Sequence, residues 1–234
     1  MTESTDPKGQ AASKPSRGVA FIGEGATEKV FYREYLTTRA SSLGLDVSRH
    51  EGDVDAEYRC GRVDSGCTVV MFHGAGSISS IPKTLGWFRG VCLGEWPRLG
   101  WDVFLCFDTD GHNDAITQYH LGDWIALRQG LCDLGANVFD LAADADIEDI
   151  MLIDLDGVRR YAGAPDDFVP VGRKGKSRMK HLFRAAGPGH AYHEGPRAKE
   201  LIASLDMDRI REQAPASIDF DLVDRCVFGV GSGV

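Results

Sequence analysis

The stretch GVAFIGEGATEKVFYREYL, residues 18–36, decides the type of fold. Its first five residues form an apolar run of the length of a buried strand, and Gly23-Glu24-Gly25 then interrupts the run. The residues after the interruption carry their apolar side chains in helical register. We therefore expect a strand, a tight turn and a helix, with Glu24 at the end of the strand and Glu28 in the first helical turn.

The same succession of strand and helix recurs three times along the chain. Apolar strands are predicted in TVVMFHGAGSI (68–78), WDVFLCFDTDGHND (101–114) and ANVFDLA (136–142), each followed by a segment that we expect to be helical. Because these runs are apolar on successive residues and not only on alternate ones, they indicate an α/β fold with a mostly parallel, four-stranded sheet covered on both faces. Residues 44–67 are polar and lack periodicity, so we leave them unassigned.

The chain changes character after residue 155. The segments KSRMKHLFRAAG, GPRAKELIASLD and DRIREQAP predict helices separated by links that contain Gly, Pro and His. We expect three parts: a disordered tail at 1–17, rich in Ser, Thr, Pro, Gly and charge; an α/β domain at 18–155; and a basic helical C-terminal extension at 156–234 packed on the sheet.

Composition excludes several classes of protein. A chain of 234 residues with 43% hydrophobic residues can bury one good-sized core, and it contains no apolar run long enough to cross a bilayer. The six cysteines lack CxxC spacing, which favours free thiols in a reducing compartment over a disulfide framework or a zinc site. We therefore predict a cytoplasmic protein without a membrane partner.

Charge is distributed unevenly along the chain. The net charge of −9 argues against a protein that binds nucleic acid over its whole surface. However, residues 140–156 hold seven acids and no base, whereas residues 172–184 hold six Lys or Arg residues and no acid. An acidic site beside a basic stripe would suit a polyanionic substrate held over metal ions. The alternative is that the stripe is only a solvated helix face.

Carboxylates gather where the predicted strands end. Glu24 and Glu28 follow the first strand, Asp108 and Asp110 end the third, and an acidic cluster that includes Glu148 follows the fourth. The carboxyl ends of parallel strands meet at one edge of the sheet, so these groups would repel one another unless a cation lay among them. Oxygen ligands point to Mg²⁺ or Mn²⁺ over zinc. Each motif alone is also explained by turn geometry or by the helix dipole.

Two of these motifs resemble a known family. FIGEGATE (21–28) and VFLCFDTDG (103–111) resemble the strand-ending Glu-Gly and the Asp-x-Asp strand of the Toprim domain, which occurs in type IA topoisomerases, bacterial primases and OLD-family nucleases. The resemblance covers roughly residues 18–155. The pattern ADIEDIMLID, with the basic segment beyond it, is similar to small stand-alone Toprim proteins met in phage defence.

The resemblance implies a nuclease that uses two Mg²⁺ or Mn²⁺ ions to cleave phosphodiester bonds in DNA or RNA, and a partner ATPase in some cases. Glu24 would act as metal ligand or general acid/base, Asp108 and Asp110 would hold an ion, and Glu28 and Glu148 would complete the second ion site. The catalytic lysine would be Lys176, with Lys174 and Lys180 as rivals. Nucleic acid would be bound by the basic stripe, namely Arg173, Lys174, Lys176, Arg178 and Lys180.

Two other functions stay open at this point. FDTDG also resembles the motif of haloacid dehalogenase phosphatases, although it follows the third strand here and leaves Glu24 unexplained. A non-catalytic Toprim module that binds nucleic acid or a partner would carry the same acids. The sequence does not separate DNA from RNA, or endonuclease from exonuclease, and it leaves the oligomeric state open.

Overall fold

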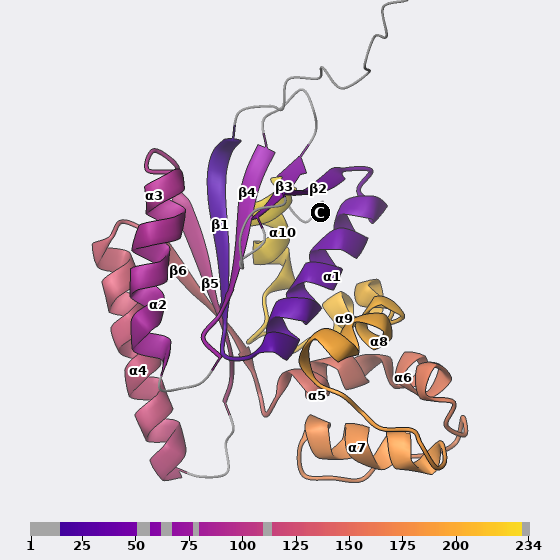
Figure 1. Cartoon of the computed structure of the whole chain (residues 1–234). Helices are drawn as coiled ribbons and strands as arrows, with labels where there is room; N and C mark the ends of the chain where they lie inside the picture. Colours follow the sequence, from indigo (N-terminus) through magenta and orange to yellow (C-terminus); the bar gives the residue numbers. More distant parts are fainter. Residues whose placement is uncertain (1–14, 51–56, 62–66, 77–79, 110–113, 231–234) are drawn as a thin grey trace, which may run out of the picture.

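A six-stranded sheet forms the centre of the protein in the computed structural model, which describes residues 15–50, 57–61, 67–76, 80–109 and 114–230 (Figure 1). The strands run in the order β2-β3-β4-β1-β5-β6. Their bounds are β1 (Pro15–Gly23), β2 (Asp46–His50), β3 (Glu57–Gly61), β4 (Cys67–Gly74), β5 (Trp101–Asp108) and β6 (Asn137–Ala143).

The four predicted strands are confirmed as one all-parallel block, β4-β1-β5-β6. β1 lies inside this block and is buried on both faces: Val19 and Phe21 belong to the hydrophobic cluster on one face, and Ala20 and Ile22 to the cluster on the other. A strand enclosed on both faces needs apolar residues at successive positions, which is why the pattern is continuous.

Two additional strands lie in the segment that the sequence left unassigned. β2 pairs antiparallel with β3, and β3 pairs antiparallel with β4, so this pair extends the sheet beyond its parallel block. Their short polar sequences contain no strand periodicity. They are strands because β3 pairs with β4 and β2 pairs with β3. β1 also begins at Pro15, inside the expected tail, where it pairs with the start of β4 at Cys67. The Arg17 Nη1 donates to the carbonyl oxygens of Arg225 and Cys226, both at 3.1 Å.

The helices cover both faces of the sheet. After β1 comes α1 (Ala26–Ser42); after β4 come α2 (Ile81–Trp87), the π-helical turn η2 (Phe88–Cys92) and α3 (Leu93–Glu95); after β5 comes α4 (Asp114–Asp133). After β6 the chain forms α5 (Ile147–Met151), η3 (Leu152–Asp154), α6 (Leu155–Ala162), α7 (Gly175–Ala185), η4 (Gly195–Ala198), α8 (Lys199–Ala203), α9 (Met207–Gln213) and α10 (Phe220–Phe228). The helical C-terminal part is therefore confirmed, with α6 and α10 beyond the helices predicted.

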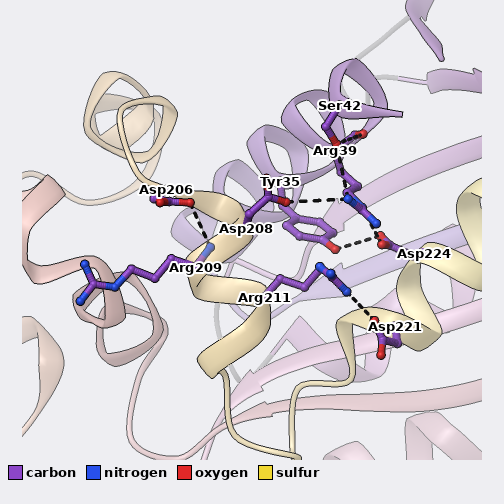
Figure 2. A network of polar contacts seen from close by, with 9 residues as sticks. All are labelled: Tyr35, Arg39, Ser42, Asp206, Asp208, Arg209, Arg211, Asp221 and Asp224. Atoms are coloured by element: carbon purple, nitrogen blue, oxygen red, sulfur yellow. Dashed lines mark hydrogen bonds and ion pairs between the residues drawn. The ribbon is translucent and has the colours of Figure 1, made fainter. Parts of the chain in front are cut away.

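α1 and the C-terminal helices share one face of the sheet, and α2 and α4 cover the other (Figure 1). On the first face, Tyr35 and Arg39 of α1 reach α10. The Tyr35 hydroxyl donates to Asp224 Oδ1 at 2.8 Å, and Arg39 Nε donates to Asp224 Oδ2 at 2.7 Å (Figure 2). The last helix is thus joined by polar contacts to the first.

The order in which strands are added to the sheet changes direction between β1 and β5. The connection after β1 leads through α1 to the β4 side of the sheet, whereas the connection after β5 leads through α4, on the opposite face, to β6. Open α/β sheets bind ligands outside the carboxyl ends of the strands at such a point. None of the described helices combines the length and the apolar character needed to cross a membrane.

Candidate functional site

A pocket of about 460 Å³ opens at the carboxyl ends of β1 and β5. Its charged lining residues come from both halves of the chain and are Glu24, Glu28, Asp108, Glu148, Lys176 and Glu194. The structure thus brings together five residues singled out from the sequence, all except Glu194. The fifth predicted metal ligand, Asp110, lies outside the described residues.

The turn after β1 positions the first two acids. The Glu24 amide donates to the carbonyl of Cys106 at 3.1 Å, and its own carbonyl accepts from the Gly76 amide at 3.1 Å, so the turn is tied to the ends of both β5 and β4. The Glu28 carboxylate folds back to accept from the Gly25 amide at 3.2 Å. A Cβ on Gly25 would lie 2.9 Å from Glu28 Oε2, so only glycine leaves room for this contact.

Asp108, at the end of β5, fixes the start of α5. Its Oδ1 accepts from the Ile147 amide at 3.1 Å, and the neighbouring Thr109 amide donates to the carbonyl of Ala143 at 2.9 Å. The carboxylate therefore joins the end of β5 to the segment that follows β6. Glu148, the next residue along α5, enters the same pocket from this segment.

Glu148 is only 1% exposed and has a buried partner that the sequence did not indicate. The Tyr192 hydroxyl donates to Glu148 Oε1 at 2.8 Å. Tyr192 lies in GPGHAYHEG, one of the links between the predicted C-terminal helices, in which His190 and His193 are exposed. A tyrosine between two histidines carries no sequence signal for this role, because its partner lies 44 positions away.

Lys176 reaches the pocket from the first turn of α7. Its amide donates to Asp146 Oδ2 at 3.0 Å, and its Nζ lies 3.0 Å from Glu194 Oε2. The contact between α7 and α5 is close at Gly175, where a Cβ would lie 2.2 Å from the Asp149 amide nitrogen. Glycine at this position therefore allows α7 to dock where Lys176 can line the pocket.

The other basic residues of the stripe are dispersed around α7. Lys180 Nζ lies 3.7 Å from Glu194 Oε1, and Arg178 forms an ion pair with Asp149 of α5. Lys174 is the N-cap residue of α7, and Arg173 is exposed. Lys174 and Lys180, the two rivals for the catalytic lysine, are not among the described residues that line the pocket.

Crowding and burial change how the carboxylates ionise. Burial raises the pKa of Asp108 to about 9, and the charges of Glu28, Glu148 and Glu24 add to the rise. Burial also raises the pKa of Glu148 to about 7, against the lowering effect of the Tyr192 hydrogen bond, and it raises the pKa of Glu28. These carboxylates therefore lie in a site that favours their protonated forms unless positive charge is added.

The pKa of Lys176 is also raised, which for a lysine favours the charged form. Burial lowers its pKa, but the hydrogen bond to Glu194 and the charges of Glu148, Glu194 and Asp108 outweigh burial and raise the pKa overall. The ammonium group is therefore held in its charged form beside the acids.

The donor set suits a hard divalent cation, since it consists of carboxylate oxygens. Asp108, Glu28 and Glu148 each use one oxygen in a hydrogen bond to the protein, which orients the group. Within the part of the chain that the structure describes, no three His, Cys, Asp or Glu side chains form a ready-made metal site. The acids line one pocket without converging on one point, so an ion would have to draw them together.

A scan against protein-family models and searches of curated proteins and of solved structures gave no match to this chain. The Toprim resemblance therefore stays a prediction that rests on the motifs at 21–28 and 103–111. The α/β architecture does not depend on it, because the sheet order and the parallel pairing establish the fold class.

Proposed function

We propose that this protein is a Toprim-type nuclease that uses Mg²⁺ or Mn²⁺ to cleave phosphodiester bonds in DNA or RNA. One observation carries the proposal: acids from three separate segments line a single pocket together with Lys176, at the point where the strand order of the parallel block changes direction. These acids are Glu24 with Glu28, Asp108, and Glu148. Phosphodiester cleavage needs groups of both signs, because carboxylates hold the cations and a basic residue neutralises the phosphate.

The surroundings of each residue suggest its role in the proposed reaction. Glu28, Asp108 and Glu148 are held by hydrogen bonds and would bind the ions, with Asp110 as a further ligand in this proposal. A bound divalent ion would polarise the phosphoryl oxygen and lower the pKa of an attacking water. Glu24, at the half-buried strand end, would bind an ion or accept the proton of that water. Lys176 would contact the phosphate.

The composition of the pocket favours this function over the two alternatives. A phosphatase of the haloacid dehalogenase type would use the Asp108 motif and leave Glu24 and Glu28 without a role in the same pocket. A purely binding module would place several acidic groups against a polyanion with only Lys176 in the pocket to offset the repulsion. The family resemblance extends the proposal to phage defence and to a partner ATPase that controls the nuclease.

Neutral isosteres of two acids test the proposed function. In Glu24→Gln and Asp108→Asn proteins we expect Mg²⁺- or Mn²⁺-dependent cleavage of labelled DNA or RNA to fall by on the order of a hundredfold or more, because each change removes a ligand or the general base. Asp167→Asn, an exposed acid after α6, is the matched control and should cleave as the wild type does. Cleavage is followed on denaturing gels, and circular dichroism checks the fold.

Three outcomes would contradict the proposal. Full activity in both pocket variants would show that cleavage occurs elsewhere. If neither DNA nor RNA is cleaved with either ion, while binding persists in EDTA, the protein is a binding module. Release of phosphate from a small monoester that requires Asp108 and is indifferent to Glu24→Gln would identify a phosphatase.

A further inference from the structure

Glu194 is the one charged residue of the pocket that the proposed chemistry does not use. It precedes η4, and its carboxylate lies between two ammonium groups of α7: Oε2 is 3.0 Å from Lys176 Nζ and Oε1 is 3.7 Å from Lys180 Nζ. Lys176 and Lys180 are four positions apart on a helix, so their side chains share one face. Two ammonium groups on one face, spanned by the two oxygens of one anion, form an arrangement that also suits a phosphate.

The contacts of Glu194 are of a kind that another anion can replace. The side chains of Lys176, Lys180 and Glu194 are 40%, 48% and 43% exposed. Lysine–carboxylate pairs with this degree of exposure are weak, because water screens them and holding long side chains in place costs entropy. A phosphate group that is also drawn to cations in the pocket would compete well for the same two ammonium groups.

The backbone around Glu194 is anchored on both sides. Two residues earlier, the Tyr192 hydroxyl donates to Glu148; one residue later, the Gly195 amide donates to Thr27 Oγ1 at 2.9 Å. Gly195 has a φ of 65°, which favours glycine at this turn. Because these contacts do not involve the Glu194 side chain, its carboxylate can leave the two lysines while the chain on either side keeps its place.

We propose that Lys176 and Lys180 form a binding site for a phosphate group of the substrate, and that the Glu194 carboxylate occupies this site until the phosphate displaces it. The inference deepens the proposed nuclease function and rests on it for the identity of the substrate, a nucleic acid. It assigns Lys180, one residue of the basic stripe, to the same phosphate group as Lys176, and it gives the acid between the two lysines a role as an internal competitor.

The test is a binding measurement that needs no cleavage. Fluorescence anisotropy with a fluorescein-labelled single-stranded DNA, and with an RNA of the same sequence, is recorded in EDTA and again with Ca²⁺. Glu194→Gln should tighten binding by roughly three- to tenfold, because the competing charge is gone. Glu200→Gln, which makes the same charge change at an exposed position of α8, should leave the affinity near that of the wild type.

A double-mutant comparison assigns the gain to the two lysines. Adding Lys176→Gln or Lys180→Gln to Glu194→Gln should remove the gain, with thermal unfolding as the check that each protein is folded. Equal gains in the Glu194 and Glu200 variants, or no gain in Glu194→Gln, would overturn the proposal even for a protein that cleaves. A gain in a protein that cleaves neither DNA nor RNA would overturn the nuclease function and support the phosphate site.

Discussion

The surroundings of Asp108 in the fold change how its carboxyl group ionises. In the sequence it is the first acid of an Asp-x-Asp motif, which most often forms a simple turn. In the fold it is half-buried, accepts a hydrogen bond from the Ile147 amide, and lies near Glu28 and Glu148. Burial and like charge together raise the pKa of its carboxyl group to about 9.

This shift predicts how stability depends on pH. Between about pH 4 and about pH 9 the native protein holds a proton on Asp108 that the unfolded chain releases, so the free energy of unfolding should fall as the pH rises through this range. Glu148 adds to the fall up to about pH 7. Thermal melts in EDTA should show the decline, and Asp108→Asn should flatten it by up to about 1.4 kcal/mol per pH unit.

The same thermal melts can be repeated with divalent cations. If the ionised acids bind Mg²⁺ or Mn²⁺, the melting temperature should rise on adding the ion, and rise more at high pH, where the carboxylates give up their protons more readily. Parallel pH dependence for the wild type and Asp108→Asn would contradict the assigned pKa shift. Exposed Asp167→Asn serves again as the control.

At the scale of elements, α1 is held in place by the far end of the chain. Asp224 of α10 is 3% exposed and accepts hydrogen bonds from Tyr35 and Arg39 of α1 (Figure 2). Since α1 carries Glu28 at its first turn, the packing of α10 bears on the position of the site. Neighbouring Arg211 and Asp221 form a more exposed pair, at 2.6 Å, in the same network.

Removing the buried carboxylate should therefore be costly. Asp224→Ala would leave the Tyr35 hydroxyl and the Arg39 guanidinium without their buried acceptor, and we expect a loss of about 3 kcal/mol in the free energy of unfolding. Asp221→Ala, on the same helix but 44% exposed, should cost about 1 kcal/mol or less. Denaturant melts measure the free energy of unfolding of both variants. Equal losses would show that the buried contacts of Asp224 stabilise the protein no more than the exposed pair does.

At the scale of the whole molecule, the C-terminal helices complete the core of the sheet. Fully buried Ile202, Ile210 and Val223 belong to the same hydrophobic cluster as Val19 and Phe31. The segment after residue 155 is therefore continuous with the core on one face. It also supplies Lys176 and Glu194 to the pocket and, through Tyr192, a hydrogen bond to Glu148.

A chain shortened to residues 1–155 tests this dependence. We expect it to lack a cooperative thermal transition and to bind a hydrophobic dye, because the apolar residues of β1 and α1 on that face would be open to water. The full-length chain is the reference in circular dichroism and dye binding. A shortened chain with a sharp transition and no dye binding would show that the sheet folds independently of the C-terminal helices.

Much of the architecture could be read from local pattern. Continuous apolar runs mark β1, β4 and β5, since burial on both faces removes the need for polar residues, and the edge strand β6 is only partly buried. The acids at the ends of two of them, Glu24 and Asp108, could be placed at one edge because parallel strands all point the same way. The antiparallel pair β2 and β3 could not be predicted from its sequence, which lacks strand periodicity; β2 pairs with β3, and β3 pairs with β4.

The sequence by itself thus determined the parallel α/β sheet and the edge where its acids collect, because strand burial and chain direction are local consequences of the pattern. Only the tertiary structure decided which later residues complete the pocket. Lys176 lines it, while Lys174 and Lys180 do not, and Gly175 allows α7 to lie close to α5. Glu194 joins the pocket, and Tyr192 holds Glu148, through contacts between segments distant in the chain, and such contacts depend on packing that no short pattern encodes.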